Sequence, residues 1–339
     1  MLHNRLMDLS IGKLRGLQRI AGARGVFTIC AMDHRGSLEG KFCSDIADFL
    51  CPESMTDFKL DLCRTLSPYA SAVLLDPVFG AAQAIARSLP AKRSGILISL
   101  EETGYSGNSE SRDTVLLTDW SVSKIKRMGA DAVKLLVYYR PDVEAASRQL
   151  HLIAEVADQC KRWDILFVVE ALSYPIGSEI GDPDQYARIK PGLVIQTARD
   201  FTAHPIDIFK AEFPADLHVT HTVAEAHRLC RELTNASTRP WVLLSAGTDY
   251  DIFKRQVEIA CDSGASGFLA GRAIWQEAID MTGPLRRDFL ATTAVNRLKK
   301  LSGLVRRYAT PWQRRIGLNG EVLVDVPANW YRHYGEDLV

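Results

Sequence analysis

Four charged residues stand near the ends of otherwise apolar runs in this chain: Asp33, Lys134, Glu170 and Lys210. A lysine amine attacks a carbonyl only when it is unprotonated, and a second cation together with low-dielectric walls lowers the pKa of such a lysine. A neighbouring carboxylic acid can then move protons while the carbinolamine loses water. Two lysines and two carboxylates in one interior therefore favour Schiff-base chemistry. Taken singly, each of the four is more often an ordinary salt-bridge residue.

Two turns with glycine could bind a phosphate group. Leu244, Ser245 and Gly247 lie in the first turn, and Gly271 and Arg272 lie in the second. Small residues leave backbone N–H groups accessible to an anion, and a guanidinium or a helix N-terminus attracts it. The alternative interpretation is two ordinary turns with an unrelated surface arginine.

These residues fall on or directly after eight short apolar runs, each of which predicts a strand buried on both faces. The runs are residues 25–33, 71–77, 95–101, 131–139, 165–172, 206–214, 240–247 and 266–271. Alternation along a strand places Glu170 on the same face as Leu166 and Val168, and the same parity applies to Asp33 and Lys210. Amphipathic stretches typical of helices lie between most of the runs, at 120–128, 142–162, 222–233 and 250–263.

The alternation of strands and helices predicts an α/β fold. Successive runs are far enough apart for right-handed βαβ crossovers, and eight such units favour a closed (β/α)8 TIM barrel over an open doubly wound sheet. The GxGxxG turn of a dinucleotide-binding sheet does not follow the first run. We expect one domain over residues 1–339, with the barrel at about 25–283. A helix within 1–24 would close its bottom, and a helix and aromatic tail at 284–339 would pack on the body or on a partner subunit.

The composition is that of an ordinary globular chain, with 339 residues of which 47% are hydrophobic and 24% charged. The 41 Lys+Arg residues balance 41 Asp+Glu residues, so we expect neither nucleic acid nor a membrane as a partner. The chain contains no apolar stretch of the roughly 20 residues that a membrane span needs. Seven scattered cysteines without a CxxC pair favour a reducing, cytoplasmic location.

A metal site is an alternative at the HxxH spacing of His218 and His221, with His227 nearby. These histidines follow the sixth run in a loop-to-helix region, and the sequence shows no second set of ligands. We therefore expect no metal and no cofactor. Residues 104–108 are expected to form a solvated connection.

Seven motifs carry a family resemblance. They are AMDHRG (31–36), EETGYSGNSESR (101–112), DAVKLLVYYRPD (131–142), VVEAL (168–172), IDIFKAEFP (206–214), LLSAG (243–247) and FLAGRAIW (268–275). In order and spacing they resemble the tagatose-1,6-bisphosphate aldolase family of class I aldolases, from about residue 25 to 280.

The resemblance implies a metal-independent lyase that reversibly cleaves a ketohexose 1,6-bisphosphate to dihydroxyacetone phosphate and glyceraldehyde 3-phosphate. It implies that Lys210 forms the Schiff base, that Glu170 dehydrates the carbinolamine, and that Lys134 keeps Lys210 reactive and stabilises oxygen charge. Asp33 would contact substrate hydroxyls at the bond that breaks, beside His34, where the family usually has glutamine. The phosphate of the dihydroxyacetone phosphate half would be held by Leu244, Ser245, Gly247, Gly271 and Arg272.

Two alternatives remain for the activity. Residues 57–76 and 264–275 resemble equally well a sulfofructose-phosphate aldolase branch, in which the substrate would be sulfofructose 1-phosphate. A non-catalytic regulator that binds sugar phosphates is disfavoured, because both lysines and both carboxylates are present. The expected partners are a small sugar phosphate and further copies of the chain, as a homodimer or a larger homo-oligomer. Arg112 is placed to reach a second anion at the far end of an open-chain ketose, which favours bisphosphates.

Overall fold

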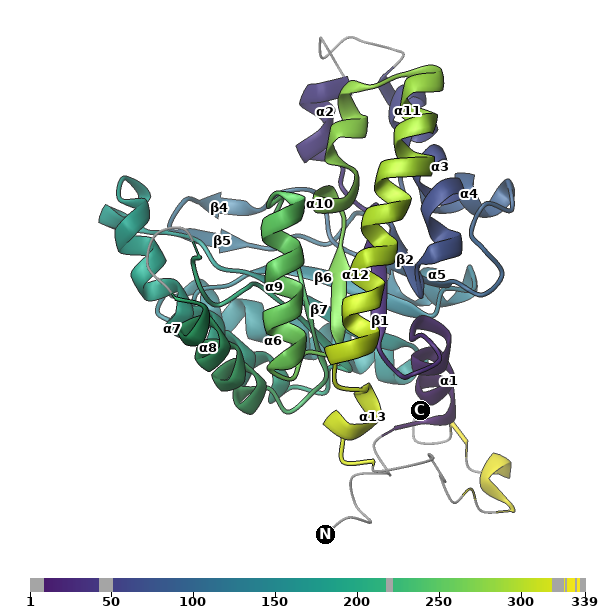
Figure 1. The fold of residues 1–339 in the computed structure, drawn as a ribbon. Helices are drawn as coiled ribbons and strands as arrows, with labels where there is room; N and C mark the ends of the chain where they lie inside the picture. The colour runs from purple at the N-terminus through teal and green to yellow at the C-terminus, as the bar shows by residue number, and fades with distance from the viewer. Residues whose placement is uncertain are drawn as a thin grey trace.

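The computed structural model describes residues 9–42, 51–217, 222–318, 326, 328–332, 334 and 335. Eight parallel strands close into a barrel in the order β1–β10–β9–β8–β7–β6–β3–β2 (Figure 1). Their bounds are β1 (Phe27–Ala31), β2 (Ala72–Leu75), β3 (Gly95–Ser99), β6 (Ala132–Tyr138), β7 (Leu166–Leu172), β8 (Ile208–Ala211), β9 (Trp241–Leu243) and β10 (Gly267–Ala270). Each predicted run contains one of these strands, so the predicted (β/α)8 barrel is confirmed.

Helices pack around the outside of this barrel (Figure 1). They are α2 (Gly36–Phe42), α3 (Cys51–Leu66), α4 (Ala81–Ala86), α5 (Val122–Arg127), α6 (Ala145–Arg162), α7 (Pro183–Thr202), α8 (Val223–Ala236), α9 (Tyr250–Asp262) and α10 (Arg272–Trp275). Three of the four predicted helical stretches contain one of them (α5, α6 and α9), and the fourth, 222–233, covers all of α8 except its last three residues. Helices α3 and α7 lie outside those stretches, although each crosses between two strands. None of the described helices is long and apolar enough to cross a membrane.

Helix α1 (Ile11–Ile20) closes the end of the barrel where the strands begin. A Cβ built on Gly16 would lie 2.9 Å from the side chain of Leu166, the first residue of β7, so the helix lies directly against the barrel rim. Leu17 and Ile20 belong to the cluster that fills the interior, together with Trp312 at the start of α13 (Trp312–Arg315). The predicted closing helix is therefore confirmed, and a second segment from the far end of the chain joins it.

The C-terminal helix runs without a break, but a π-helical turn interrupts its α-helical hydrogen bonding. It consists of α11 (Gly283–Phe289), a π-helical turn (Leu290–Ala294) and α12 (Val295–Tyr308). After it, Trp312 is buried and the Tyr334 hydroxyl donates a hydrogen bond to Asp164. Tyr331, in contrast, is 61% exposed. The expected packing of the aromatic tail on the body thus applies to some of its rings and not to others.

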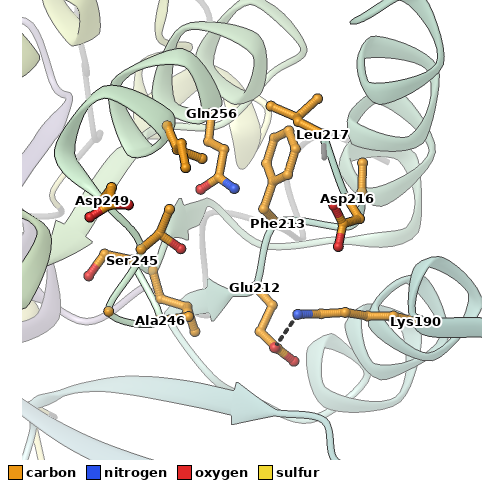
Figure 2. A pocket seen from close by; sticks show the side chains of 14 residues that line it. Lys190, Glu212, Phe213, Asp216, Leu217, Ser245, Ala246, Asp249 and Gln256 are labelled. Atoms are coloured by element: carbon orange, nitrogen blue, oxygen red, sulfur yellow. Dashed lines mark ion pairs between the residues drawn. The ribbon is translucent and has the colours of Figure 1, made fainter. Parts of the chain in front are cut away.

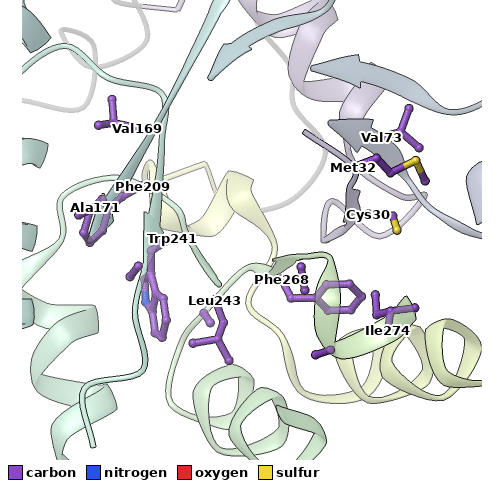
Figure 3. Packing of buried hydrophobic residues seen from close by; sticks show 14 of the residues in the cluster. Cys30, Met32, Val73, Val169, Ala171, Phe209, Trp241, Leu243, Phe268 and Ile274 are labelled. Carbon is purple, nitrogen blue, oxygen red and sulfur yellow. The ribbon is translucent and has the colours of Figure 1, made fainter. Parts of the chain in front are cut away.

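Alternate residues of each strand face two separate apolar layers. Ile29, Leu97, Val168 and Ile208 point into the barrel interior. Their neighbours in the sequence point outward to the helices, and Figure 3 shows this outer layer with Cys30, Val73, Val169, Phe209, Trp241 and Phe268. The predicted parity is therefore correct, and it directs Lys210, two residues after Ile208, toward the interior.

A short antiparallel hairpin of β4 (Ser106–Asn108) and β5 (Ser111–Asp113) follows β3 and lies outside the barrel sheet. Gly107 has φ +90°, and a Cβ there would lie 2.2 Å from the Ser111 carbonyl oxygen, so the hairpin requires glycine at this position. Residues 104–108 are exposed, as a solvated connection would be. Asp113, however, pairs with Arg148 of α6 at 2.9 Å, which ties the hairpin to the body.

Candidate active site

Lys134 of β6 lies at the centre of a buried cluster near the ends of the strands. Its Nζ atom lies 2.9 Å from Asp33 Oδ2, 2.7 Å from Glu101 Oε1 and 2.9 Å from Glu170 Oε2. The Lys134 side chain is only 3% exposed. The structure thus brings Lys134, Asp33 and Glu170 together, and it adds a third carboxylate.

Glu170 is shared between two lysines. Strand pairing places Glu170 of β7 beside Lys210 of β8, and Glu170 Oε1 lies 2.7 Å from Lys210 Nζ. The other carboxylate oxygen contacts Lys134. Within the described ranges, Glu170 is the only ion-pair partner of Lys210, whereas Lys134 has three. The two amines therefore differ in how strongly they are held.

The charges of the cluster stabilise one another. Burial favours the neutral form of Lys134, but the carboxylates of Asp33, Glu101 and Glu170 outweigh burial and raise the pKa of Lys134 well above its usual value. Burial would likewise raise the pKa of Glu170, yet the ammonium groups of Lys134 and Lys210 lower it. Lys134 is therefore a cation near neutral pH, and Glu170 is an anion.

His34 lies between this cluster and the end of β10. Its Nδ1 lies 3.9 Å from Asp33 Oδ1, and its ring meets the Trp275 ring edge-on at 5.2 Å. Burial outweighs the attraction of Asp33 and lowers the pKa of His34 to about 3. The imidazole is thus neutral, and its buried Nδ1 has no hydrogen-bond partner among the described residues.

The two predicted phosphate turns lie side by side. Leu244 and Ser245 follow β9, and Gly247 next to them has φ +76°. A Cβ on Gly247 would lie 3.3 Å from Arg272 Cζ, and a Cβ on Gly271 would lie 2.7 Å from His34 Cε1. Glycine at both positions therefore allows the turns, the guanidinium and the imidazole to meet.

Arg272 supplies the positive charge of this region. It begins α10, which is only one turn long, so the guanidinium itself and not a helix dipole is the main attraction for an anion. The Arg272 Nε atom is buried and has no hydrogen-bond partner in the described part of the chain. Leu244 is buried, so it contributes backbone rather than its side chain.

A cavity of about 370 Å³ lies next to the turn after β9, between the loops that follow β8 and β9. Ser245 and Gly247 line one side of it, and Glu212 and Lys190 line another. Figure 2 shows the ion pair between Lys190 of α7 and Glu212, which is 2.8 Å long. The cavity is not lined by Lys134, Glu170 or Lys210. It is therefore a side chamber of the phosphate turn and not the chamber of the catalytic cluster.

Glu101 and Lys59 are site residues that sequence reasoning missed. Glu101 ends the third apolar run as Asp33 ends the first, so the same strand-end signal could have identified it. Lys59 of α3 is fully buried, and its Nζ donates to the carbonyl oxygens of Met32 (3.0 Å) and His34 (2.6 Å) and pairs with Asp76. These carbonyls flank Asp33, so Lys59 holds the chain that presents Asp33 to Lys134.

Of the three histidines considered for a metal site, His227 alone lies within the described ranges. His218 and His221 lie outside the described residues. His227 of α8 lies with its Nδ1 3.2 Å from Ser263 Oγ. Among the described residues, no group of three or more His, Cys, Asp or Glu side chains could hold a metal ion.

Comparison with known proteins identifies the family. The sequence matches the model of the DeoC/LacD family aldolases over residues 27–277. The chain belongs to this family. It is 31% identical over 331 residues to tagatose 1,6-diphosphate aldolase of Listeria monocytogenes, covering 92% of this chain and 97% of the relative. It is also 31% identical over 334 residues to tagatose 1,6-diphosphate aldolase 2 of Streptococcus agalactiae, covering 91% and 100%.

Solved structures of aldolases share the fold. An archaeal fructose 1,6-bisphosphate aldolase superimposes with a TM-score of 0.58 at 20% identity, over 86% of this chain and 98% of that one. Fructose-bisphosphate aldolase from Slackia heliotrinireducens gives 0.60 at 15% identity, over 87% and 92%. The predicted family is confirmed, and the protein is a class I aldolase, a carbon–carbon lyase.

Proposed function

We propose that this aldolase cleaves ketohexose 1,6-bisphosphates of the tagatose or fructose type through a Schiff base on Lys210. The observation that carries the proposal is the Glu170 carboxylate, which contacts the buried Nζ atoms of both Lys210 and Lys134. One carboxylate between two amines can take a proton from one amine while the other remains a fixed positive charge. The names of the two relatives support the substrate class.

Lys134 and Lys210 differ in the number of carboxylates that they contact, and this difference determines which of them is the nucleophile. Deprotonating Lys134 would leave three carboxylates facing one another without the cation between them. Deprotonating Lys210 removes one ion pair, and Glu170, which accepts the proton, keeps its contact with Lys134. Lys210 is therefore the amine that attacks, and Lys134 stabilises negative charge that develops on oxygen.

The reaction proceeds with protons balanced between Lys210 and Glu170. The ammonium of Lys210 gives a proton to Glu170, and the free amine bonds to C2 of the open-chain ketose. The carbonyl oxygen on C2 takes that proton from Glu170. Glu170 next moves a proton from nitrogen to the hydroxyl, which leaves as water and forms the iminium ion. Asp33 takes the C4 hydroxyl proton, the C3–C4 bond breaks, and its electron pair moves into the iminium to form an enamine.

Release of the products reverses these steps. Glyceraldehyde 3-phosphate leaves as the aldehyde, and C3 gains a proton that balances the one taken by Asp33. Water then hydrolyses the iminium and frees dihydroxyacetone phosphate and the Lys210 amine. Because the iminium ion is the electron sink, we expect EDTA to leave the rate unchanged. Loss of activity that zinc restores would argue against this mechanism.

The turns after β9 and β10 are proposed to bind the phosphate next to C1. Ser245, Gly247, Gly271 and Arg272 form the anion site, and Leu244 supports it from the buried side. His34 offers a neutral imidazole to a substrate hydroxyl next to Asp33. One imidazole and one carboxylate offer few fixed hydrogen bonds against an epimer, so we expect loose discrimination at C4. A phosphate dianion gains more from a second guanidinium than a sulfonate monoanion does, so we also expect preference for bisphosphates over sulfofructose 1-phosphate.

Reduction with borohydride in the presence of dihydroxyacetone phosphate tests the proposal. We expect irreversible inactivation, with mass spectrometry locating the adduct on the peptide that contains Lys210. The Lys210→Met variant should form no adduct. Glycerol 3-phosphate, which has the phosphate but no carbonyl, is the control ligand and should leave the wild-type enzyme active. An adduct on Lys134, or none on the folded wild-type enzyme, would refute the assignment.

Location and assembly are proposals on the sequence alone. We propose a cytoplasmic homo-oligomer in which residues 1–339 form one domain. Light scattering on the purified chain measures the number of subunits, and a single cooperative unfolding transition would support one domain.

A further inference from the structure

A second cavity lies at the end of the barrel where the strands begin, opposite to the catalytic cluster. Its volume is about 280 Å³, and four of its lining residues are arginines: Arg24, Arg306, Arg307 and Arg314. They come from three segments, which are the connection between α1 and β1, the last turn of α12, and α13. Figure 1 shows α12 running down into α13 at this end of the molecule. We call this feature the arginine cavity.

The positive charge of the arginine cavity is not balanced by acids of the described chain. Basic and acidic residues are equal in number over the whole sequence. None of the described residues that line this cavity is an Asp or a Glu, and its four arginines are exposed and form no ion pair within the described ranges. A hollow lined by one sign of charge concentrates its electric field and attracts counter-ions. The arginine cavity is therefore a candidate site for an anion.

The end of α12 accounts for part of this charge. Basic side chains favour the last turn of a helix, because the free carbonyl oxygens there carry partial negative charge. Arg24 has such a role, since its Nη1 donates to the Arg306 carbonyl oxygen at 2.8 Å. The guanidinium groups of Arg306, Arg307 and Arg314, in contrast, form no hydrogen bond with the described residues. Three of the four guanidinium groups thus remain available to a ligand.

The arginines are attached to an ordered frame. Trp312 is buried in the interior cluster, and its main-chain N–H donates to the Gly25 carbonyl oxygen at 2.8 Å, which joins the start of α13 to the segment before β1. Arg307 Cζ lies 5.1 Å from the centre of the Tyr308 ring, and an aromatic face holds a guanidinium without neutralising its charge. A frame that is already fixed lowers the entropy lost when a ligand binds.

We propose that the arginine cavity binds the linked phosphates of a diphosphate or triphosphate, either as an inorganic anion or as the phosphate chain of a nucleotide. A single phosphate group carries about 1.5–2 negative charges near neutral pH, so it would balance only two of the four guanidinium groups. Linked phosphates carry more charge and offer separate oxygens to each planar fork. The cavity is slightly smaller than the roughly 300–1,000 Å³ of pockets that enclose an organic ligand, so it suits a phosphate chain whose remainder extends into solvent.

Calorimetric titration of the full chain with tripolyphosphate, in the presence of EDTA, tests the proposal. We expect the double variant Arg306→Gln/Arg307→Gln to raise the dissociation constant about tenfold or more, because charge-assisted contacts are lost. The single variant Arg314→Gln, on the other helix, should weaken binding in the same direction. No binding to the wild-type chain, or unchanged binding in both variants, would overturn the proposal. Urea unfolding confirms that each variant is folded.

The matched control is the double variant Lys299→Gln/Lys300→Gln. It removes two charges from the same helix, but neither lysine lines the cavity, so the dissociation constant should stay within about twofold of wild type. Equal weakening in the two double variants would reveal only an effect of net charge and overturn the site. Arg272→Ala should still bind tripolyphosphate. Loss of all binding in that variant would place the anion at the turns after β9 and β10 instead.

Other probes distinguish the kinds of anion. Orthophosphate should bind at least about tenfold more weakly than tripolyphosphate, and equal affinities would show a site for a single anionic group and overturn the proposal. Binding of ATP supports it in either of two ways: tighter binding than tripolyphosphate identifies a nucleotide as the source of the phosphates, and equal binding identifies the phosphate chain alone. A single-stranded oligonucleotide that binds more tightly than both would assign the surface to nucleic acid and contradict the proposal.

Discussion

Buried lysines occur on both sides of the barrel wall, and their ion pairs are arranged differently. Inside the barrel, Lys134 contacts three carboxylates and shares one of them, Glu170, with Lys210. Outside the barrel wall, Lys59 contacts one carboxylate, Asp76, and two backbone carbonyl oxygens. Burial lowers the pKa of Lys59 in spite of Asp76, whereas the three carboxylates raise that of Lys134.

The difference separates a structural ion pair from a reactive one. The two oxygens of Asp76 are fully used, since one pairs with Lys59 and the other accepts from the N–H groups of Val78 and Phe79. A proton transfer there would leave buried groups unpaired. Glu170, in contrast, can lose its contact with Lys210 and keep the one with Lys134. A shared carboxylate permits chemistry that an exclusive pair does not.

The Glu170→Gln substitution tests the reactive group. An amide cannot move the protons that carbinolamine formation and dehydration require, so we expect kcat to fall by about 10² to 10⁴ with a much smaller change in KM. The unfolding free energy should change less than in Lys59→Met, because Lys134 keeps Asp33 and Glu101. Steady-state kinetics and urea unfolding measure both. Wild-type kcat in a folded Glu170→Gln enzyme would remove Glu170 from the mechanism.

The Lys59→Met substitution tests the structural pair. It leaves the Asp76 carboxylate buried without a cation, so we expect the unfolding free energy to fall by about 3–5 kcal/mol. Adding Asp76→Asn removes the stranded charge, and an amide oxygen can still accept from Val78 and Phe79, so the double variant should recover part of the loss. Urea titrations of the three proteins measure this. An unchanged urea unfolding midpoint in Lys59→Met would show that the Lys59–Asp76 pair does not stabilise the fold.

The Arg272→Ala substitution tests a cation that has no carboxylate partner among the described residues, neither a shared one like Glu170 nor an exclusive one like Asp76. Its Nε atom is buried without a hydrogen-bond partner among the described residues, and if Arg272 binds the phosphate, its loss should cost about 1.5–3 kcal/mol of binding free energy for phosphorylated substrates. Inhibition constants for dihydroxyacetone phosphate should therefore rise about 10- to 100-fold. Unphosphorylated dihydroxyacetone is the comparison ligand and should bind both proteins equally. Parallel losses for both ligands would place Arg272 outside the phosphate site.

His34 connects the two groups, because its carbonyl accepts from Lys59 and its ring faces Asp33. Its pKa is about 3 in the folded protein against 6.5 in the unfolded chain, so its contribution to stability is present above pH 6.5 and is lost as the pH falls toward 3. Between pH 7 and pH 5 we expect this loss to be about 2 kcal/mol. His34→Gln should reduce that pH dependence in urea unfolding. An identical slope in both proteins would show that His34 titrates normally.

The strand-end chemistry was predictable and the supporting contacts were not. Alternation along the strands placed Asp33, Glu170 and Lys210 on inward faces, because period-two patterns do not depend on distant residues. Lys59 occurs in an amphipathic stretch, where a lysine usually faces solvent, and its burial depends on how α3 packs on β1 and β2. Arg112 lies near three tyrosine rings, which come from a loop (Tyr105), from β6 (Tyr138) and from the segment after β7 (Tyr174). Only the register of those strands brings them together.

Helix α1 and the start of α13, which are about 290 residues apart in the sequence, meet at the barrel floor, and this determines when the barrel can close during synthesis. Trp312 joins Leu17 and Ile20 in the interior cluster, and β1 pairs with β10 about 240 residues later in the sequence. A chain that leaves the ribosome from its N-terminus therefore carries β1 with one unpaired edge until β10 has been made, and α1 lacks its last packing partner until Trp312 has been made. A nascent chain stopped before β10 would be an open sheet prone to pair with its neighbours. Closure of the barrel is thus a late, nearly all-or-none event, and a premature stop before Trp312 would remove the residue that seals the floor.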